Sequence, residues 1–127
     1  MAEREIIEAP GAPAAIGPYS HAVRHGGLLF CSGQIPLDPD SGELVGTDAA
    51  TQARRCLENL AAVCAHAGTS LARALRMTIY MTELGEFAAV NEVYASFFVS
   101  EPPARVTVGV AQLPKGAQVE IDAIVAL

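Results

Sequence analysis

The sequence predicts an α+β fold in which two helices cover one face of a single mixed β-sheet. Patterns typical of strands and helices follow one another in the order strands, helix, strand, helix and strands. The 127 residues are 51% hydrophobic and 17% charged, a composition that suits a globular protein with a sizeable core. No repeat or long linker divides residues 1–127, so we expect one domain. Helices on one face leave the other face open, which favours a homo-oligomer.

The first third of the chain predicts a short strand, a hairpin and a surface loop. Residues 5–7 form at most a short strand, because prolines and glycines follow. Residues 20–24 and 28–32 flank the sequence His-Gly-Gly, which is typical of a hairpin turn. Residues 36–46 contain two Asp, one Ser and two Gly, which indicates a loop.

Two amphipathic helices are predicted in the middle of the chain. The first begins after Asp48, a suitable N-cap, and runs to about Ala67, where Gly68 suits its end. Its apolar face contains Ala53, Leu57, Leu60, Cys64 and Ala67. The second covers residues 86–98, before two prolines, with Phe87, Val90, Tyr94 and Phe97 on one stripe. Between the helices, residues 74–82 predict a strand that carries Leu75, Met77, Ile79 and Met81 on one face.

The last two predicted strands each carry a charged residue where a buried sheet favours none. Arg105 opens the strand 106–110, and Glu120 interrupts the strand 119–125. A guanidinium can bind a carboxylate through two parallel hydrogen bonds. Burial can raise the pKa of a carboxyl group so that it serves as an acid or base. The two residues therefore suggest a site for a small carboxylic acid whose neighbouring carbon reacts with water.

Each of these charges also has a structural explanation. Arg105 can form a salt bridge on an edge strand, and Glu120 can face solvent on the same side as Asp122. If residues 114–117 formed a tight turn, Glu120 would lie opposite Ala111, and Arg105 would be roughly 20 Å away. Either the two strands are not hairpin partners, or the site joins Arg105 of one subunit to Glu120 of another. Both alternatives are consistent with a cleft between subunits.

Three further polar residues are candidates for the same site. Tyr19 lies in the loop 16–20, where its hydroxyl can bind a ligand or its ring can pack. Ser32 precedes a glycine that permits close backbone approach. Asn91 lies beside the apolar stripe of the second helix and needs hydrogen-bond partners, for which a loop backbone is the simpler explanation.

Composition argues against several classes of function. The formal net charge of −6 disfavours nucleic-acid binding, which needs basic patches. No uncharged apolar stretch is long enough to cross a bilayer, and the N-terminus lacks the apolar core of a signal peptide. The three cysteines and three histidines have no metal-ligand spacing. We therefore expect a cytoplasmic protein with reduced thiols, no metal, no cofactor and no membrane or nucleic-acid partner.

The chain resembles the RidA (YjgF-type) family of enamine/imine deaminases over nearly its whole length. The matching residues are Ile16-Gly17-Pro18-Tyr19-Ser20, Ser32-Gly33-Gln34-Ile35-Pro36, Gln52 with Asn59-Leu60, Ala67-Gly68, Asn91 with Tyr94 and Phe97-Phe98, Pro103-Ala104-Arg105, and Val119-Glu120-Ile121-Asp122-Ala123. The resemblance implies a chorismate-mutase-like subunit that assembles as a homotrimer, with sites in the three interfaces. It also implies hydrolysis of 2-aminoacrylate or 2-iminobutyrate to a 2-keto acid and ammonia, that is, a 2-iminobutanoate/2-iminopropanoate deaminase.

The resemblance also implies roles for individual residues. Arg105 matches the arginine that binds the substrate carboxylate, and Glu120 matches the glutamate that positions or activates water. Tyr19, Ser32 and Asn91 fall where residues line or support the family's pocket.

Two positions depart from the family's pattern. His21 stands where many members have glutamine. Thr107, a further substrate-binding candidate, stands where some members have cysteine, and this difference bears on substrate preference. Because some relatives do not deaminate imines, a second hypothesis stays open: a non-catalytic trimer that binds a small carboxylate or regulates a partner. A nuclease is disfavoured by the net charge of −6 and the lack of a metal-ligand pattern.

Overall fold

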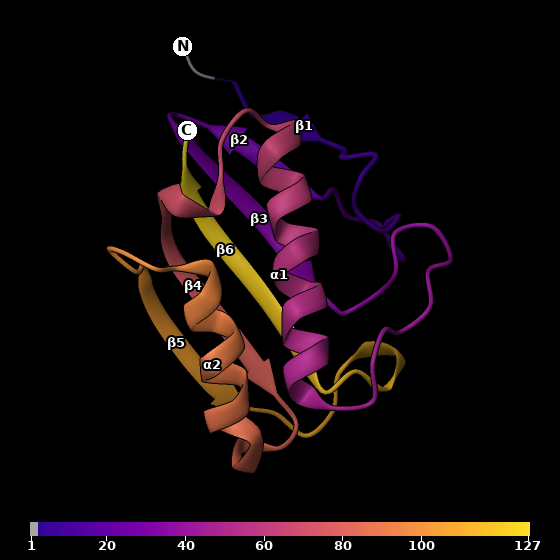
Figure 1. The fold of residues 1–127 in the computed structure, drawn as a ribbon. Coiled ribbons are helices and arrows are strands. Elements are labelled where there is room, and N and C mark those ends of the chain that lie inside the picture. The colour runs from indigo at the N-terminus through magenta and orange to yellow at the C-terminus, as the bar shows by residue number, and fades with distance from the viewer. Residues whose placement is uncertain (1–2) are drawn as a thin grey trace.

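The computed structural model describes residues 3–127, which form one six-stranded sheet with two α-helices on one face (Figure 1). The strand order is β1-β2-β3-β6-β4-β5, and every neighbouring pair is antiparallel except β4 and β5, which are parallel. The elements are β1 (Glu5–Ile7), β2 (Ala22–His25), β3 (Leu28–Gln34), α1 (Ala49–His66), β4 (Ala74–Met81), α2 (Phe87–Phe97), β5 (Ala104–Gly109) and β6 (Val119–Ala126). This architecture confirms the predicted α+β fold with a single mixed sheet.

Helix α1 forms where the capping pattern predicts it. The Asp48 carboxylate accepts a hydrogen bond from the Thr51 backbone N–H at 2.8 Å, which satisfies one free donor at the start of the helix. After the helix, Gly68 has a φ of +85°, a conformation that glycine adopts without strain. The predicted apolar face is buried against the sheet.

Residues 3–127 contain no helix that is long and apolar enough to span a membrane.

Strand β4 alternates as predicted except at its start. Met77, Ile79 and Met81 are fully buried beneath the helices, but Leu75, which was predicted on the same face, is 49% exposed. The pairing of β4 with β6 shifts register between Ala74 and Arg76, and this irregularity takes Leu75 out of the alternation.

The predicted hairpin over β2 and β3 is confirmed. His25 pairs with Leu28, and Gly26 and Gly27, the two residues between them, both have positive φ values of 57° and 84°. A two-residue turn of this kind matches the twist of the flanking strands, and glycine adopts it without strain.

The strands that carry Arg105 and Glu120, β5 and β6, are not neighbours in the sheet. Strand β4 lies between β5 and β6, so the two charged strands are not hairpin partners. The register pairs Arg105 with Met77, on the helix-covered face, and Glu120 with Tyr80, on the open face. The two charges therefore point to opposite sides of the sheet.

The open face carries apolar side chains that residues 3–127 do not cover. Phe30 is 43% exposed on β3, and Val106 and Val108 are 39% and 37% exposed on β5. Figure 1 shows both helices on the other side of the sheet, α1 next to β3 and β6 and α2 next to β4 and β5. The helices thus bury one face only, as the sequence predicts.

Candidate functional site

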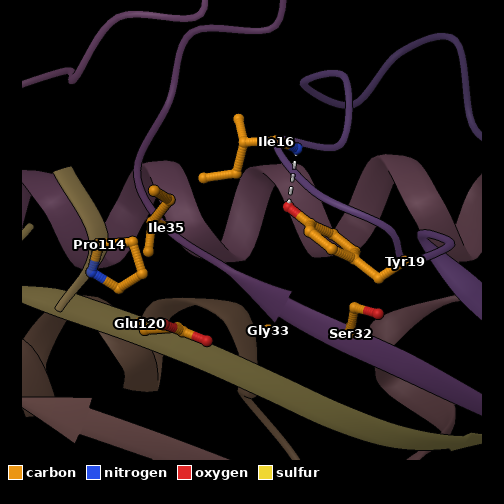
Figure 2. Close-up of a pocket in the computed structure, with 7 residues that line it drawn as sticks. All are labelled: Ile16, Tyr19, Ser32, Gly33, Ile35, Pro114 and Glu120. Carbon is orange, nitrogen blue, oxygen red and sulfur yellow. Dashed lines mark hydrogen bonds between the residues drawn. The ribbon is translucent and has the colours of Figure 1, made fainter.

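Glu120 lies in a cavity of about 340 Å³ beside β3 and β6 (Figure 2). We call this cavity the Glu120 pocket. Its lining residues come from the loop before β2, from the end of β3, from the turn before β6 and from β6: Ile16, Tyr19, Ser32, Gly33, Ile35, Pro114 and Glu120. Three of the predicted site residues, Tyr19, Ser32 and Glu120, are therefore brought together by the fold.

An irregularity in β3 makes room for the Glu120 side chain. The ladder between β3 and β6 shifts register between Cys31 and Gln34, so Gly33 faces Glu120 without a regular partner. A Cβ atom added to Gly33 would lie 3.0 Å from the carboxyl carbon of Glu120 and would overlap one carboxyl oxygen. A larger residue at position 33 would therefore force the Glu120 carboxyl group to move, so the glycine leaves room for the carboxyl position seen here.

The surroundings of Glu120 raise the pKa of its carboxyl group above the ordinary glutamate value. Partial burial is the main cause, because it disfavours the charged form, and the negative charge of Asp122 on the same face adds to it. Asp122 is itself held by the Tyr80 hydroxyl, which donates a hydrogen bond of 2.8 Å to its carboxylate. Glu120 therefore keeps its proton to higher pH than a solvated glutamate, which suits proton exchange.

The two hydroxyl groups of the Glu120 pocket also stabilise its walls. Ser32 donates a hydrogen bond of 2.6 Å from Oγ to the Ser20 carbonyl, which ties β3 to the loop before β2. Tyr19 accepts a hydrogen bond of 3.2 Å at its hydroxyl oxygen from the Ile16 backbone N–H, drawn as a dashed line in Figure 2. The residue is 42% exposed, so packing in the core does not explain this tyrosine. The hydroxyl of Tyr19 keeps its own proton to donate.

Arg105 lies on the other face, in a cradle of side chains from α2. Its Nη1 donates a hydrogen bond of 2.8 Å to Oδ1 of Asn91. The guanidinium carbon lies 4.8 Å from the ring centre of Tyr94 and 5.4 Å from that of Phe87, distances typical of cation–π contact. The prediction of a backbone partner for Asn91 is wrong, because its amide oxygen binds the Arg105 side chain. Phe87 and Tyr94 were predicted only as core residues, and no sequence signal pairs them with Arg105.

Among residues 3–127, no carboxylate lies within 4.0 Å of the Arg105 guanidinium. The predicted salt bridge on an edge strand is therefore not formed. Arg105 lines a cavity of about 600 Å³ together with Asn91 and Tyr94, which we call the Arg105 half-site. Thr107 lies two residues further along the same face of β5, and its hydroxyl has no hydrogen-bond partner among the described residues.

The described part of the chain contains no group of three His, Cys, Asp or Glu side chains that could hold a metal ion. Cys31, Cys56 and Cys64 are buried free thiols. Burial raises the pKa of the Cys56 thiol, so this side chain is not a reactive thiolate. The polar groups that the Glu120 pocket and the Arg105 half-site present are one guanidinium, one carboxyl group, two hydroxyl groups beside Glu120 and the Asn91 amide.

The family described as Endoribonuclease L-PSP matches residues 9–127. Its relatives include TdcF of Escherichia coli (strain K12), whose name describes a reactive intermediate deaminase and which is 45% identical over 124 residues, or 95% of each chain. The chain belongs to this family, which is the RidA/YjgF family predicted from the sequence.

Solved structures agree with this assignment. The crystal structure of Escherichia coli TdcF with bound serine is 44% identical, matches with a TM-score of 0.92, and covers 97% of this chain and 98% of that one. RidA from an Antarctic Psychrobacter is 40% identical, matches with a TM-score of 0.93, and covers 97% and 99% of the two chains. The chorismate-mutase-like fold expected from the resemblance is therefore confirmed.

Proposed function

We propose that the protein is a hydrolytic deaminase of reactive 2-imino acids and their enamine forms, such as 2-iminobutyrate and 2-aminoacrylate. The observation that carries this proposal is the presentation of Arg105. Its guanidinium is oriented by Asn91 and two aromatic rings, and no carboxylate of residues 3–127 neutralises it. An oriented arginine without a partner is suited to bind the carboxylate of a small substrate.

We infer that the complete site forms between two copies of the chain, in a homotrimer. One chain holds Arg105 and Glu120 on opposite faces of its sheet, so it cannot apply both to one small molecule. The exposed apolar side chains of the open face give a second copy a surface to bury. The Arg105 half-site of one copy would then complete the Glu120 pocket of the next.

In the proposed reaction, Arg105 holds the substrate carboxylate and thereby fixes the imine carbon next to a water molecule. Glu120 accepts a proton from that water as its oxygen forms a bond to the imine carbon. The carboxyl group then returns the proton to nitrogen, which gives a carbinolamine. The carboxylate next takes the proton of the new hydroxyl group and passes it to the same nitrogen, so that the carbonyl forms as the carbon–nitrogen bond breaks and ammonia leaves. One imine and one water give one 2-keto acid and one ammonia. The hydroxyls of Tyr19 and Ser32 line the same pocket and are suited to orient the water or the leaving nitrogen.

The raised pKa of Glu120 supports its role as the group that both takes and returns the proton. A solvated glutamate would be a weak base and would lose its proton before it could serve as an acid near neutral pH. Thr107 lies on the Arg105 side of the site, where its unpaired hydroxyl is suited to influence the choice of substrate. We also expect the protein to act in the cytoplasm, close to the reactions that release such imines.

A second hypothesis, a trimer that binds a small carboxylate without catalysis, uses the same Arg105. The relative TdcF has been crystallised with bound serine, an amino acid with a carboxylate. The nuclease activity in the family's description is less well supported, because the formal net charge of −6 disfavours a nucleic-acid partner.

The experiment that separates these functions couples the protein to a serine or threonine dehydratase and measures the rate of keto-acid and ammonia release. We expect Arg105→Ala to abolish the acceleration, with exposed Arg4→Ala as the matched control. Glu120→Gln should abolish turnover yet keep carboxylate binding, with exposed Glu43→Gln as its control. If Arg105→Ala still speeds keto-acid formation relative to the dehydratase alone, the proposed role of Arg105 in holding the substrate carboxylate is contradicted. Binding without acceleration by the unmodified protein would favour the non-catalytic hypothesis.

A further inference from the structure

The imidazole of His21 fastens the loop that precedes β2. The side chain is buried, with only 3% of the residue exposed. Its Nδ1 accepts a hydrogen bond of 2.8 Å from the Ala9 backbone N–H, and its Nε2 is 2.7 Å from the Pro13 carbonyl oxygen. The amide must donate and the carbonyl must accept, so the ring is neutral with its proton on Nε2.

The segment that His21 fastens, which we call the Ala9–Tyr19 loop, forms part of the Glu120 pocket. Ile16 and Tyr19 of this loop line the pocket. The other hydrogen bonds within it are local ones, from Ala12 to Ala9, from Tyr19 to Gly17 and from Ile16 to Tyr19. Among the described residues, the His21 ring therefore makes the hydrogen bonds that join residues 9–13 of this loop to the start of β2.

A second proton on the ring would reverse one of these bonds. Protonated Nδ1 becomes a donor and faces the Ala9 N–H, so two donors would oppose each other. The Glu8 carboxylate lies 3.8 Å from Nδ1 and offers the protonated ring a new acceptor. Acid would thus move the ring from the Ala9 amide to Glu8 and leave that amide without a partner.

Other charged groups on β1, on β2 and in the loop after β3 have partners of their own. Arg24 on β2 lies 3.8 Å from Glu5 on β1. Asp38 precedes Pro39, which lines the same cavity as His21, and its carboxylate accepts from the backbone N–H groups of residues 40 and 41. Glu8 is therefore the charged group placed to respond to the ring.

We propose that His21 is a positioning residue of the Glu120 pocket and that its protonation releases the Ala9–Tyr19 loop. The neutral ring holds Ile16 and Tyr19 in the pocket wall, and the protonated ring does not. This inference rests on the proposed function only in its effect on turnover. Its structural part concerns the loop alone and can be tested whether or not the protein is a deaminase.

The structural test measures hydrogen exchange of the Ala9 amide in the full chain between about pH 5 and pH 8, the range in which histidines change charge. Rates are corrected for the intrinsic pH dependence of exchange. We expect protection of Ala9 to fall on acidification, with the same midpoint as the NMR titration of the His21 ring. Protection that persists to pH 5, or a midpoint unrelated to that ring, would overturn the proposal.

Two variants sharpen the test. His21→Gln keeps one acceptor and one donor but does not titrate, so Ala9 should stay protected at acid pH. Exposed His25→Gln is the matched control and should behave like the unmodified chain. Glu8→Gln removes the charge that stabilises the protonated ring and should move the midpoint to lower pH. An unchanged midpoint in Glu8→Gln would contradict the role assigned to Glu8.

The catalytic test compares KM and kcat of the unmodified chain and His21→Gln across the same pH range. Release of the loop should raise KM by about 3-fold to 10-fold, the factor that one lost hydrogen bond represents, with a smaller change in kcat. His21→Gln should lack this rise. If the unmodified protein has no activity at any pH, the proposed function fails while the exchange data still decide the switch. A switch in exchange without a change in KM would refute the link to the pocket.

Discussion

The Glu120 pocket and the Arg105 half-site are built by different means. The pocket around Glu120 is formed by loops, a register shift in β3 and a glycine that leaves room for the carboxyl group. The Arg105 half-site is formed by one helix face, whose amide and aromatic side chains orient a guanidinium. The first depends on backbone geometry and the second on side-chain contacts. The two regions should therefore fail in different ways when mutated.

Among variants that keep both Arg105 and Glu120, the largest effect is expected from Gly33→Ala, which adds a methyl group where the Glu120 carboxyl lies. The carboxyl group must move away from the water it is proposed to position, and a displacement of this size can cost about 100-fold in kcat. Carboxylate binding through Arg105 should persist. The assay is turnover in the coupled dehydratase system, with binding measured by calorimetry.

Gly85→Ala is the control for this prediction, because a Cβ atom at Gly85 meets no atom within 4 Å. Turnover close to that of the unmodified protein in Gly33→Ala would mean that the position of Glu120 does not limit the reaction.

An intermediate effect is expected from Asn91→Ala, which removes the hydrogen bond that orients Arg105. The rings of Phe87 and Tyr94 still contact the guanidinium, so Arg105 should remain in its cradle but with less defined orientation. We expect KM to rise about 10-fold, as for a lost hydrogen bond to a charged group. Ser96→Ala on the same helix is the control, and an equal KM in both variants would refute the orienting role.

The smallest effect is expected from Asp122→Asn, which removes one of the two causes of the raised pKa of Glu120. The unprotonated carboxyl is the proposed base, so activity should fall as pH decreases through this pKa. Without the Asp122 charge the pKa falls, and the acidic limb of the pH–rate profile moves to lower pH. Because burial is the larger cause and remains, the shift should be less than about one pH unit. A shift to higher pH would contradict this assignment.

Much of the fold could be predicted from local patterns, because the patterns and the tertiary structure agree. Local geometry is indicated directly by the cap at Asp48, by the apolar spacing in α1 and by the two glycines after His25, which predict a helix start, a helix and a tight turn. The exposure of Leu75 could not be predicted, because a register shift depends on the partner strand. A single sequence does not record which strand lies next to which.

The site was predicted in its parts but not in its arrangement. The spacing of Arg105 and Glu120 argued against one hairpin, and the structure agrees because β4 lies between their strands. The two side chains face opposite sides of the sheet because of the registers in which β5 and β6 pair with β4. These registers cannot be derived from the sequence alone. The contact between Asn91 and Arg105 was also not predicted. It joins α2 to β5 across 14 residues of sequence, and the sequence does not show how the helix packs on that strand.

The opposite orientation of Arg105 and Glu120 has a genetic consequence if the halves meet between copies as proposed. A subunit that has lost Arg105 still contributes a sound Glu120 pocket, and one that has lost Glu120 still contributes a sound arginine. A cell that carries one allele of each kind would assemble some intact sites from two individually inactive products. Such alleles would complement each other, which two lesions in a site enclosed by one chain would not do.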